Sequence, residues 1–186
     1  MLPTRTTRRL VAAGLTAVLT GGLTLGTAAA ADPAKPGSLT PAQRQVIREA
    51  TRRYRDPGSA VAAGYLPTDE CVEDPALGGM GYHYAHPRLL ADQVIDPTLP
   101  EVLVYAPDRH GGRRLVAIEY VKNDADGDLG TDDDRPSLFG EPFDGPMEGH
   151  EPGQPVHYDL HAWVWRHNPA GELAQFNPEV GCPPAA

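Results

Sequence analysis

The stretch "HYDLHAWVW", residues 157–165, sets His157, Asp159 and His161 at every second position. Side chains two residues apart point to the same face of a β-strand, so these three groups share one face if the segment is extended. Imidazole and carboxylate groups are ligands that zinc, iron, manganese and copper take in proteins. They are also frequent general acids and bases. The spacing therefore indicates a metal site or a catalytic site on a sheet.

The geometry of a strand limits which of these groups can share one ion. A strand rises about 3.3 Å per residue, which puts His157 and His161 roughly 13 Å apart. An imidazole reaches only about 6 Å from its Cα to a metal, given zinc–nitrogen bonds of about 2.0–2.1 Å. One ion can be held by His157 with Asp159, or by Asp159 with His161, and it needs further ligands from other strands.

Two residues elsewhere in the chain fit that need. Glu119 interrupts the apolar run "LVAIEYV", and His83 lies in the aromatic run "MGYHYAH". A carboxylate buried in such a run has to be paired, hydrogen-bonded, protonated or bound to a metal. We predict a site for a divalent transition metal (zinc, iron, manganese or copper) formed by His83, Glu119, His157, Asp159 and His161. In a metal-dependent hydrolase or oxidoreductase, Glu119 and His161 are the candidate catalytic residues.

The same residues also fit interpretations without a metal. In a purely structural row, His161 donates to Asp159 or to a backbone carbonyl. Glu119 then pairs with Arg114 or Arg166 across the sheet. Metal-free acid–base catalysis is the other alternative.

The aromatic residues allow a third interpretation. Trp163, Trp165 and Tyr82 would form the surface of a non-catalytic carbohydrate- or peptide-binding module. Three further histidines are expected to face solvent because each stands beside a turn or a proline: His86, His110 and His167.

The acidic stretch "NDADGDLGTDDD" offers the oxygen ligands that calcium takes, in the side chains of Asp124, Asp126, Asp128 and Asp132. It is not an EF-hand loop, because the sixth and twelfth positions from Asp124 hold Leu129 and Arg135. A structural calcium ion and a solvated acidic loop both remain open interpretations.

The segment from 137 to 155, "SLFGEPFDGPMEGHEPGQP", is rich in proline and glycine. A loop of this length in a compact domain is usually functional or disordered. Phe139 and Phe143 predict that it packs down as a lid over the histidine-bearing face. Glu148 and His150 could then enter the same pocket.

The elements that position these residues follow from capping and periodicity. Thr40, Pro41 and Gln43 mark the start of a helix that ends before Asp56-Pro57, and a second short helix ends at Gly64. Residues 101–107 and 114–123 read as one β-hairpin, and 156–167 with 172–178 as another. We predict an α+β fold, with an N-terminal helical hairpin packed on an antiparallel β-sheet or small half-barrel.

The beginning of the chain predicts export. Arg5, Arg8 and Arg9 precede an apolar stretch and the small residues "AAAA", as in a cleaved signal peptide over residues 1–31, and "TRRLVA" also fits a twin-arginine signal. No membrane anchor is expected after cleavage, and the protein is expected to be secreted or extracytoplasmic. Cys71 and Cys182 are the only cysteines and are predicted to form a disulfide, because an isolated pair in an exported chain usually does.

The remaining chain is expected to form a flexible lead-in over residues 32–39 and one domain over residues 40–186. Without the three leader arginines, 13 basic residues face 25 acidic ones, a net charge of about −12. Such a surface repels nucleic acid. The expected partner is a metal ion or a small-molecule ligand, and no pattern predicts the oligomeric state.

Several blocks of the chain occur together in a known group of proteins. The blocks "AAGYLPTDECV", "GGMGYHYAHP", "FGEPFDGP", "LHAWVWRHNPAG" and "FNPEVGC" resemble those of a family of exported bacterial proteins. The resemblance covers most of the chain after residue 31 and implies no activity, cofactor or site residue. The residues themselves therefore predict an exported soluble protein that binds a divalent metal or small ligand in a pocket of histidines and carboxylates.

Overall fold

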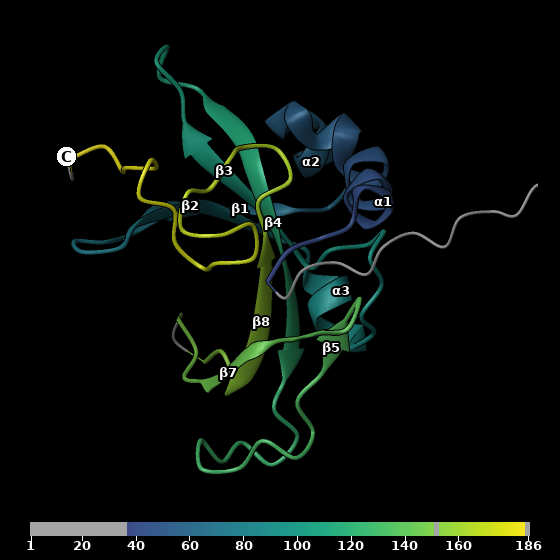
Figure 1. The fold of residues 1–186 in the computed structure, drawn as a ribbon. Coiled ribbons are helices and arrows are strands. Elements are labelled where there is room, and N and C mark those ends of the chain that lie inside the picture. The colour runs from purple at the N-terminus through teal and green to yellow at the C-terminus, as the bar shows by residue number, and fades with distance from the viewer. Residues whose placement is uncertain (1–36, 151–152, 185–186) are drawn as a thin grey trace, which may run out of the picture. The chain divides into compact units, whose positions relative to one another are not determined.

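Figure 1 shows the fold of the computed structural model, which describes residues 37–150 and 153–184. The predicted signal peptide (1–31) and residues 32–36 of the predicted lead-in lie outside the described residues. In the described part of the chain, no helix has the length and apolar character needed to cross a membrane.

Three short helical segments follow one another at the start of the domain: α1 (Pro41–Thr51), η1 (Arg52–Arg55) and α2 (Pro57–Ala62). The predicted cap of α1 is confirmed, because Thr40 Oγ1 accepts the N–H of Gln43 and the Gln43 side chain accepts the N–H of Thr40. The predicted helical hairpin is not confirmed. Helix α1 runs directly into η1, and Asp56 alone separates η1 from α2.

The predicted α+β class is confirmed by one six-stranded sheet in which every neighbouring pair is antiparallel. Its strands, in spatial order, are β1 (Leu66–Asp74), β2 (Gly78–Ala85), β3 (Val102–Pro107), β4 (Arg113–Asn123), β8 (His157–Ala162) and β7 (Asp144–Met147). A short helix, α3 (Pro87–Asp92), joins β2 to β3, and β5 (Ser137–Leu138) pairs with β6 (Glu141–Pro142).

One of the two predicted hairpins is correct. Strands β3 and β4 form the first, whereas the pairing of 156–167 with 172–178 is wrong. The partners of β8 are β4 and β7, and the segment after residue 171 is irregular. Its Glu172 binds Arg44 of α1 and accepts the backbone N–H of Leu39, so this segment is tied to the helical end of the domain.

The sheet buries two different faces. One face packs with α1, η1 and α2 in an apolar core that includes Ile47, Tyr54, Leu103, Ile118 and Leu160. Helices α1 and α2 lie together in Figure 1. We call this the apolar face. The opposite face carries small aliphatic side chains, among them Val104, Ala117 and Val121, packed with Trp163 and Val180. We call it the polar face, because the histidines and carboxylates described below project from it.

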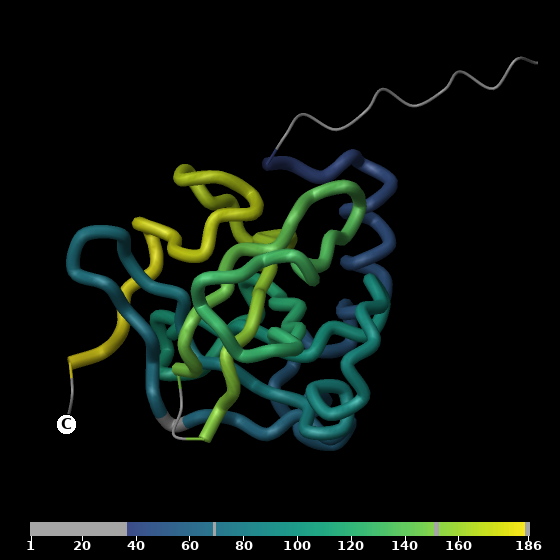
Figure 2. Tube along the Cα trace, turned by 90° about the horizontal axis from the view of Figure 1, so that it is seen from below, coloured from purple at the N-terminus to yellow at the C-terminus, as the bar shows by residue number. Residues whose placement is uncertain are grey.

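The chain end packs beside the β1–β2 hairpin, as both views show (Figures 1 and 2). The predicted disulfide is present and joins Cys71 of β1 to Cys182. Gly79 exchanges backbone hydrogen bonds with Asn177. At Gly78, which has a φ of +93°, a Cβ atom would lie 2.4 Å from the Asn177 carbonyl oxygen, so this close approach requires glycine.

Candidate metal centre

Strand β8 is buried on both sides along its whole length. Its apolar-face residues are Tyr158, Leu160 and Ala162. Its other face carries His157, Asp159 and His161, each with an exposed fraction of 0%. The strand and its alternation agree with the sequence prediction, and the polar groups of the row are enclosed in the protein.

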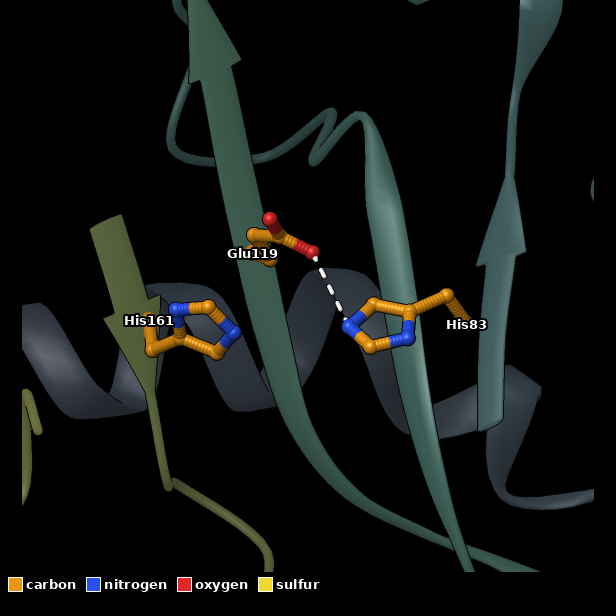
Figure 3. Close-up of side chains that lie close together, drawn as sticks. All are labelled: His83, Glu119 and His161. Carbon is orange, nitrogen blue, oxygen red and sulfur yellow. Dashed lines mark ion pairs between the residues drawn. The ribbon is translucent and has the colours of Figure 1, made fainter. Parts of the chain in front are cut away.

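Three chemically active side chains converge on the polar face (Figure 3). His161 stands directly opposite Glu119 of β4 in the antiparallel register. His83 comes from β2, and its Nε2 lies 3.5 Å from Glu119 Oε2. Each of the three residues offers a donor atom, and these atoms all lie within 4.8 Å of one another. Two imidazoles and one carboxylate are the ligand set of many iron and zinc sites.

His161 has no hydrogen-bond partner on either ring nitrogen, although its ring is fully buried. Its Nδ1 lies 3.7 Å from Asp159 Oδ1, which is within ion-pair range but too long for a hydrogen bond. His161 therefore makes neither of the hydrogen bonds, to Asp159 or to a carbonyl, that the structural interpretation expected. A buried polar group without a partner costs about 1–3 kcal/mol, so this imidazole does not stabilise the metal-free fold through hydrogen bonding.

The arginine partners expected for Glu119 in that structural interpretation are also wrong. Arg114 is exposed, and Arg166 binds Glu179 instead. The nearest side chain recorded against the Glu119 carboxylate is that of His83, whose Nε2 lies 3.5 Å from Oε2. The Glu119 carboxylate thus lies beside imidazoles and not beside arginines. Glu119 sits in the interior of the sheet, away from the charged residues at the ends of β4.

The three groups differ in their affinity for protons. Burial lowers the pKa of His83 to about 3, and the nearby His161 and His150 add to that effect. Burial raises the pKa of Glu119 to about 7. Burial also opposes a charge on His161, but the carboxylates of Glu119 and Asp159 outweigh it and raise the pKa of His161 to about 9. Near neutral pH, a metal ion finds His83 unprotonated and has to displace a proton from His161.

A second group of donors lies at the other end of the row. His150, His157 and Asp159 also offer donor atoms within 4.8 Å of one another. His157 Nδ1 lies 3.2 Å from the Pro155 carbonyl oxygen, and Nε2 has no partner. The side-chain amide of Gln175 donates to both oxygens of Asp159, at 3.1 and 3.4 Å. His157 and His161 thus belong to different groups, in line with the spacing argument.

A cavity of about 530 Å³ opens beside these groups. His83, Glu119 and His150 are part of its wall, together with apolar side chains that include Val72, Met80, Ala85, Leu90 and Val102. Among the described residues that line it there is no lysine or arginine. The wall of the cavity therefore combines metal-binding side chains with a largely apolar lining.

The predicted lid over the histidines is wrong for its aromatic part. Phe143 is buried in the core of the apolar face, and Phe139 packs against the same core. Glu148 is exposed, whereas His150 reaches the cavity wall as expected. The aromatic residues of the segment therefore close the opposite side of the sheet from the one predicted.

The three aromatic residues proposed as a sugar- or peptide-binding surface do not form one surface. Trp163 is buried on the polar face, and its Nε1 donates to the Ala174 carbonyl oxygen. Trp165 packs against the apolar core and donates to Thr51. The guanidinium of Arg113 lies 3.6 Å from the centre of the Tyr82 ring and covers it.

The aspartates proposed as calcium ligands accept hydrogen bonds from their own loop. Asp124 accepts the N–H groups of Asp126 and Gly127, and Asp126 and Asp128 each accept the N–H two residues on. Within the described ranges, these aspartates and Asp132 do not offer three donor atoms within 4.8 Å of one another. The calcium site stays a prediction.

The other histidines fall into two classes. His110 and His167 are exposed, as predicted. His86 was predicted to face solvent, and this is wrong. It is buried, because the residues after α2 fold over it: its Nε2 lies 3.2 Å from the Ala63 carbonyl oxygen, and its ring stands edge-on to Tyr65.

Comparison with known proteins identifies no relative: no family model, no curated protein and no solved structure matches the chain. The geometry of the polar face is therefore the basis for assigning a function.

Proposed function

We propose that the protein binds a divalent transition metal ion through His83, Glu119 and His161. The observation that carries the proposal is the state of His161, which is fully buried, has no hydrogen-bond partner on either ring nitrogen, and lies with Glu119 and His83 in one group of donor atoms. A metal ion would supply the missing partner and neutralise the buried carboxylate.

The spacing of the donor atoms suits this role. Tetrahedral zinc with bonds of about 2.0–2.1 Å holds its ligand atoms about 3.3 Å apart. The His83–Glu119 distance of 3.5 Å is already close to that value, and the other pairs, all within 4.8 Å, require small side-chain rotations. Three protein ligands leave at least one position for a water molecule or a ligand. Since His83 and Glu119 border the cavity, that position would face it.

The role of Asp159 in this site would be to orient His161. Histidines that bind a metal through one nitrogen usually present the other to a carboxylate or carbonyl, which fixes the ring. Asp159 Oδ1 lies 3.7 Å from His161 Nδ1, so a small shift would form that bond and leave Nε2 for the metal.

We infer that the protein works outside the cytoplasm. The disulfide between Cys71 and Cys182 supports this, because disulfides persist in oxidising compartments. The leader-like composition of residues 1–31 supports it further.

Zinc binding by the purified full chain tests the metal site. His161→Gln and His83→Ala are expected to lower the affinity of this site at least 100-fold in a chelator competition assay, which corresponds to about 2.7 kcal/mol. His110→Ala removes an exposed histidine and is expected to bind zinc as the wild type does. A folded His161→Gln variant with unchanged zinc binding contradicts the proposal.

A metal-dependent hydrolase or oxidoreductase is the second candidate, and the observation that favours it is the cavity beside a three-ligand set. A bound metal with an open position can activate water or dioxygen. Hydrolysis of p-nitrophenyl acetate by the zinc-loaded protein, and dioxygen uptake by the iron-loaded protein, test this role. If the wild type and the His161→Gln variant show equal rates in these assays, the site binds a metal but catalyses neither reaction.

A further inference from the structure

We propose that the polar face holds a second divalent transition metal ion, bound by His150, His157 and Asp159. The ligands of this site differ from those of the site proposed above, so either site can exist without the other. The observation that separates the two is the division of the donor atoms into two groups.

His157 is arranged as a metal-binding histidine would be. Its Nδ1 faces the Pro155 carbonyl oxygen at 3.2 Å, where it donates its N–H. In a neutral imidazole, the other nitrogen then carries the free lone pair. That nitrogen, Nε2, is buried and has no partner. Histidines that bind metals commonly have one nitrogen fixed by a carbonyl in this way.

Asp159 supplies a negative charge that the protein only partly compensates. Its exposed fraction is 0%, and its oxygens accept hydrogen bonds from the neutral amide of Gln175. The imidazole of His161 lies 3.7 Å away, within ion-pair range but beyond hydrogen-bond range, and it also lies near the Glu119 carboxylate. A buried carboxylate is costly unless it is paired or bound to a metal, and a cation between His157 and His150 would meet that need.

His150 completes the group from the cavity side. It is exposed and lies on the cavity wall, and its backbone N–H donates to the Gln154 side chain at 2.9 Å. Its ring stands edge-on to His157, with ring centres 5.2 Å apart. The site thus has two buried ligands and one accessible ligand, so a metal ion can enter from the cavity.

Asp159 links the two sites. It belongs to the second group, and it faces Nδ1 of His161 in the first. Both ions would border the same cavity, the first through His83 and Glu119 and the second through His150. Loss of the Asp159 charge should therefore weaken both sites, whereas loss of His157 should weaken the second alone.

Counting bound zinc after equilibrium dialysis of the full chain tests the proposal. The expected result is two zinc ions per chain in the wild type, one in His157→Ala, one in His83→Ala, and none in the double variant. His110→Ala, the matched control, should keep both. Asp159→Asn should lower the affinity of both sites.

Each other outcome has a distinct meaning. One zinc ion in the wild type that His83→Ala abolishes overturns the second site and leaves the first. One zinc ion that His157→Ala abolishes and His83→Ala does not overturns the first site and supports the second. No zinc in the wild type overturns both, and two zinc ions in a folded His157→Ala overturn the assignment of ligands.

Because His157 is buried, its variant could fail to fold, and His150→Ala guards against that outcome. His150 is exposed, so its loss should leave the metal-free melting temperature unchanged within a few degrees. The affinity for the second zinc ion should fall at least tenfold. Unchanged affinity for that ion overturns the proposal.

Discussion

The two faces of the central strands are buried to a similar degree but differ in how their polar atoms are satisfied. On the apolar face, the hydroxyls of Tyr105 and Tyr120 donate to backbone carbonyl oxygens, and that of Tyr158 donates to Asp134. On the polar face, both nitrogens of His161 and one of His157 have no partner.

This difference indicates that one face stabilises the fold and the other serves binding. A satisfied core stabilises the fold, whereas buried groups without partners cost stability and persist where they serve binding. Ile118 and Glu119 are adjacent residues of β4 that illustrate this contrast, because their side chains project to opposite faces. Substitutions on the two faces should therefore change different properties.

The largest expected effect on stability comes from the apolar face. Ile118→Ala should lower the free energy of unfolding by about 2–5 kcal/mol, because it leaves a cavity in a packed core. The zinc affinity of the folded variant should stay at the wild-type value. Urea unfolding measures the change, and Val46→Ala, at a position 39% exposed on α1, is the control with a small expected effect. A loss of stability in Ile118→Ala no larger than that in Val46→Ala would contradict the packing role of Ile118.

Substitution of the adjacent residue, Glu119 on the polar face, should lower zinc affinity without lowering stability. Glu119→Gln keeps the size of the side chain but removes a ligand charge, so zinc affinity should fall at least 100-fold, about 2.7 kcal/mol. Near pH 6 the folded protein holds a proton on this carboxyl that the unfolded chain has released, so the metal-free variant should be at least as stable as the wild type. Calorimetric titration beside Glu49→Gln, on the outer surface of α1, measures the difference. Equal zinc affinities in Glu119→Gln and Glu49→Gln would show that Glu119 is not a ligand of the metal.

A third prediction concerns Glu101, a buried acid outside both donor groups. Burial raises the pKa of its carboxyl from 4.5 to about 8. The folded protein then holds a proton that the unfolded chain releases above pH 4.5. The stability that this proton contributes is fully present below that pH. It is lost as the pH rises toward 8, at up to about 1.4 kcal/mol per pH unit.

Glu101→Gln should flatten this dependence and become more stable than the wild type at the alkaline end. Urea unfolding of the metal-free proteins across that pH window measures it. An equally steep fall in the variant would show that other groups cause the pH dependence.

The smallest expected effect comes from the helix that covers the apolar face. Thr40→Ala removes the side-chain acceptor for the N–H of Gln43 and should cost about 1 kcal/mol of stability. Thermal unfolding measures this loss, and zinc affinity should not change. A fall in zinc affinity would show that the two faces are coupled through the helix.

The local features of the fold could be predicted from the sequence. Thr40 and Gln43 carry a capping signal within four residues, and the alternation from His157 to His161 is itself the signature of a strand. Glu119 stood out because a charge in an apolar run requires a partner. The disulfide followed from two cysteines with no other candidate partner.

The long-range arrangement could not be predicted in the same way. The register that brings His83 diagonally across β3 to Glu119 depends on pairings that no single segment encodes. Strand β7, "DGPM", has none of the residues typical of strands, whereas 172–178 has an apolar pattern but is tied to α1 by Glu172. Gln175, which binds Asp159, lies in that irregular segment and carries no sequence signal.

Anomalous diffraction from crystals of the zinc-loaded protein tests the central claim most directly. We expect a zinc peak about 2.0–2.1 Å from one nitrogen each of His83 and His161 and from a Glu119 oxygen. Zinc bound only elsewhere, with these three side chains left without a metal, would contradict it.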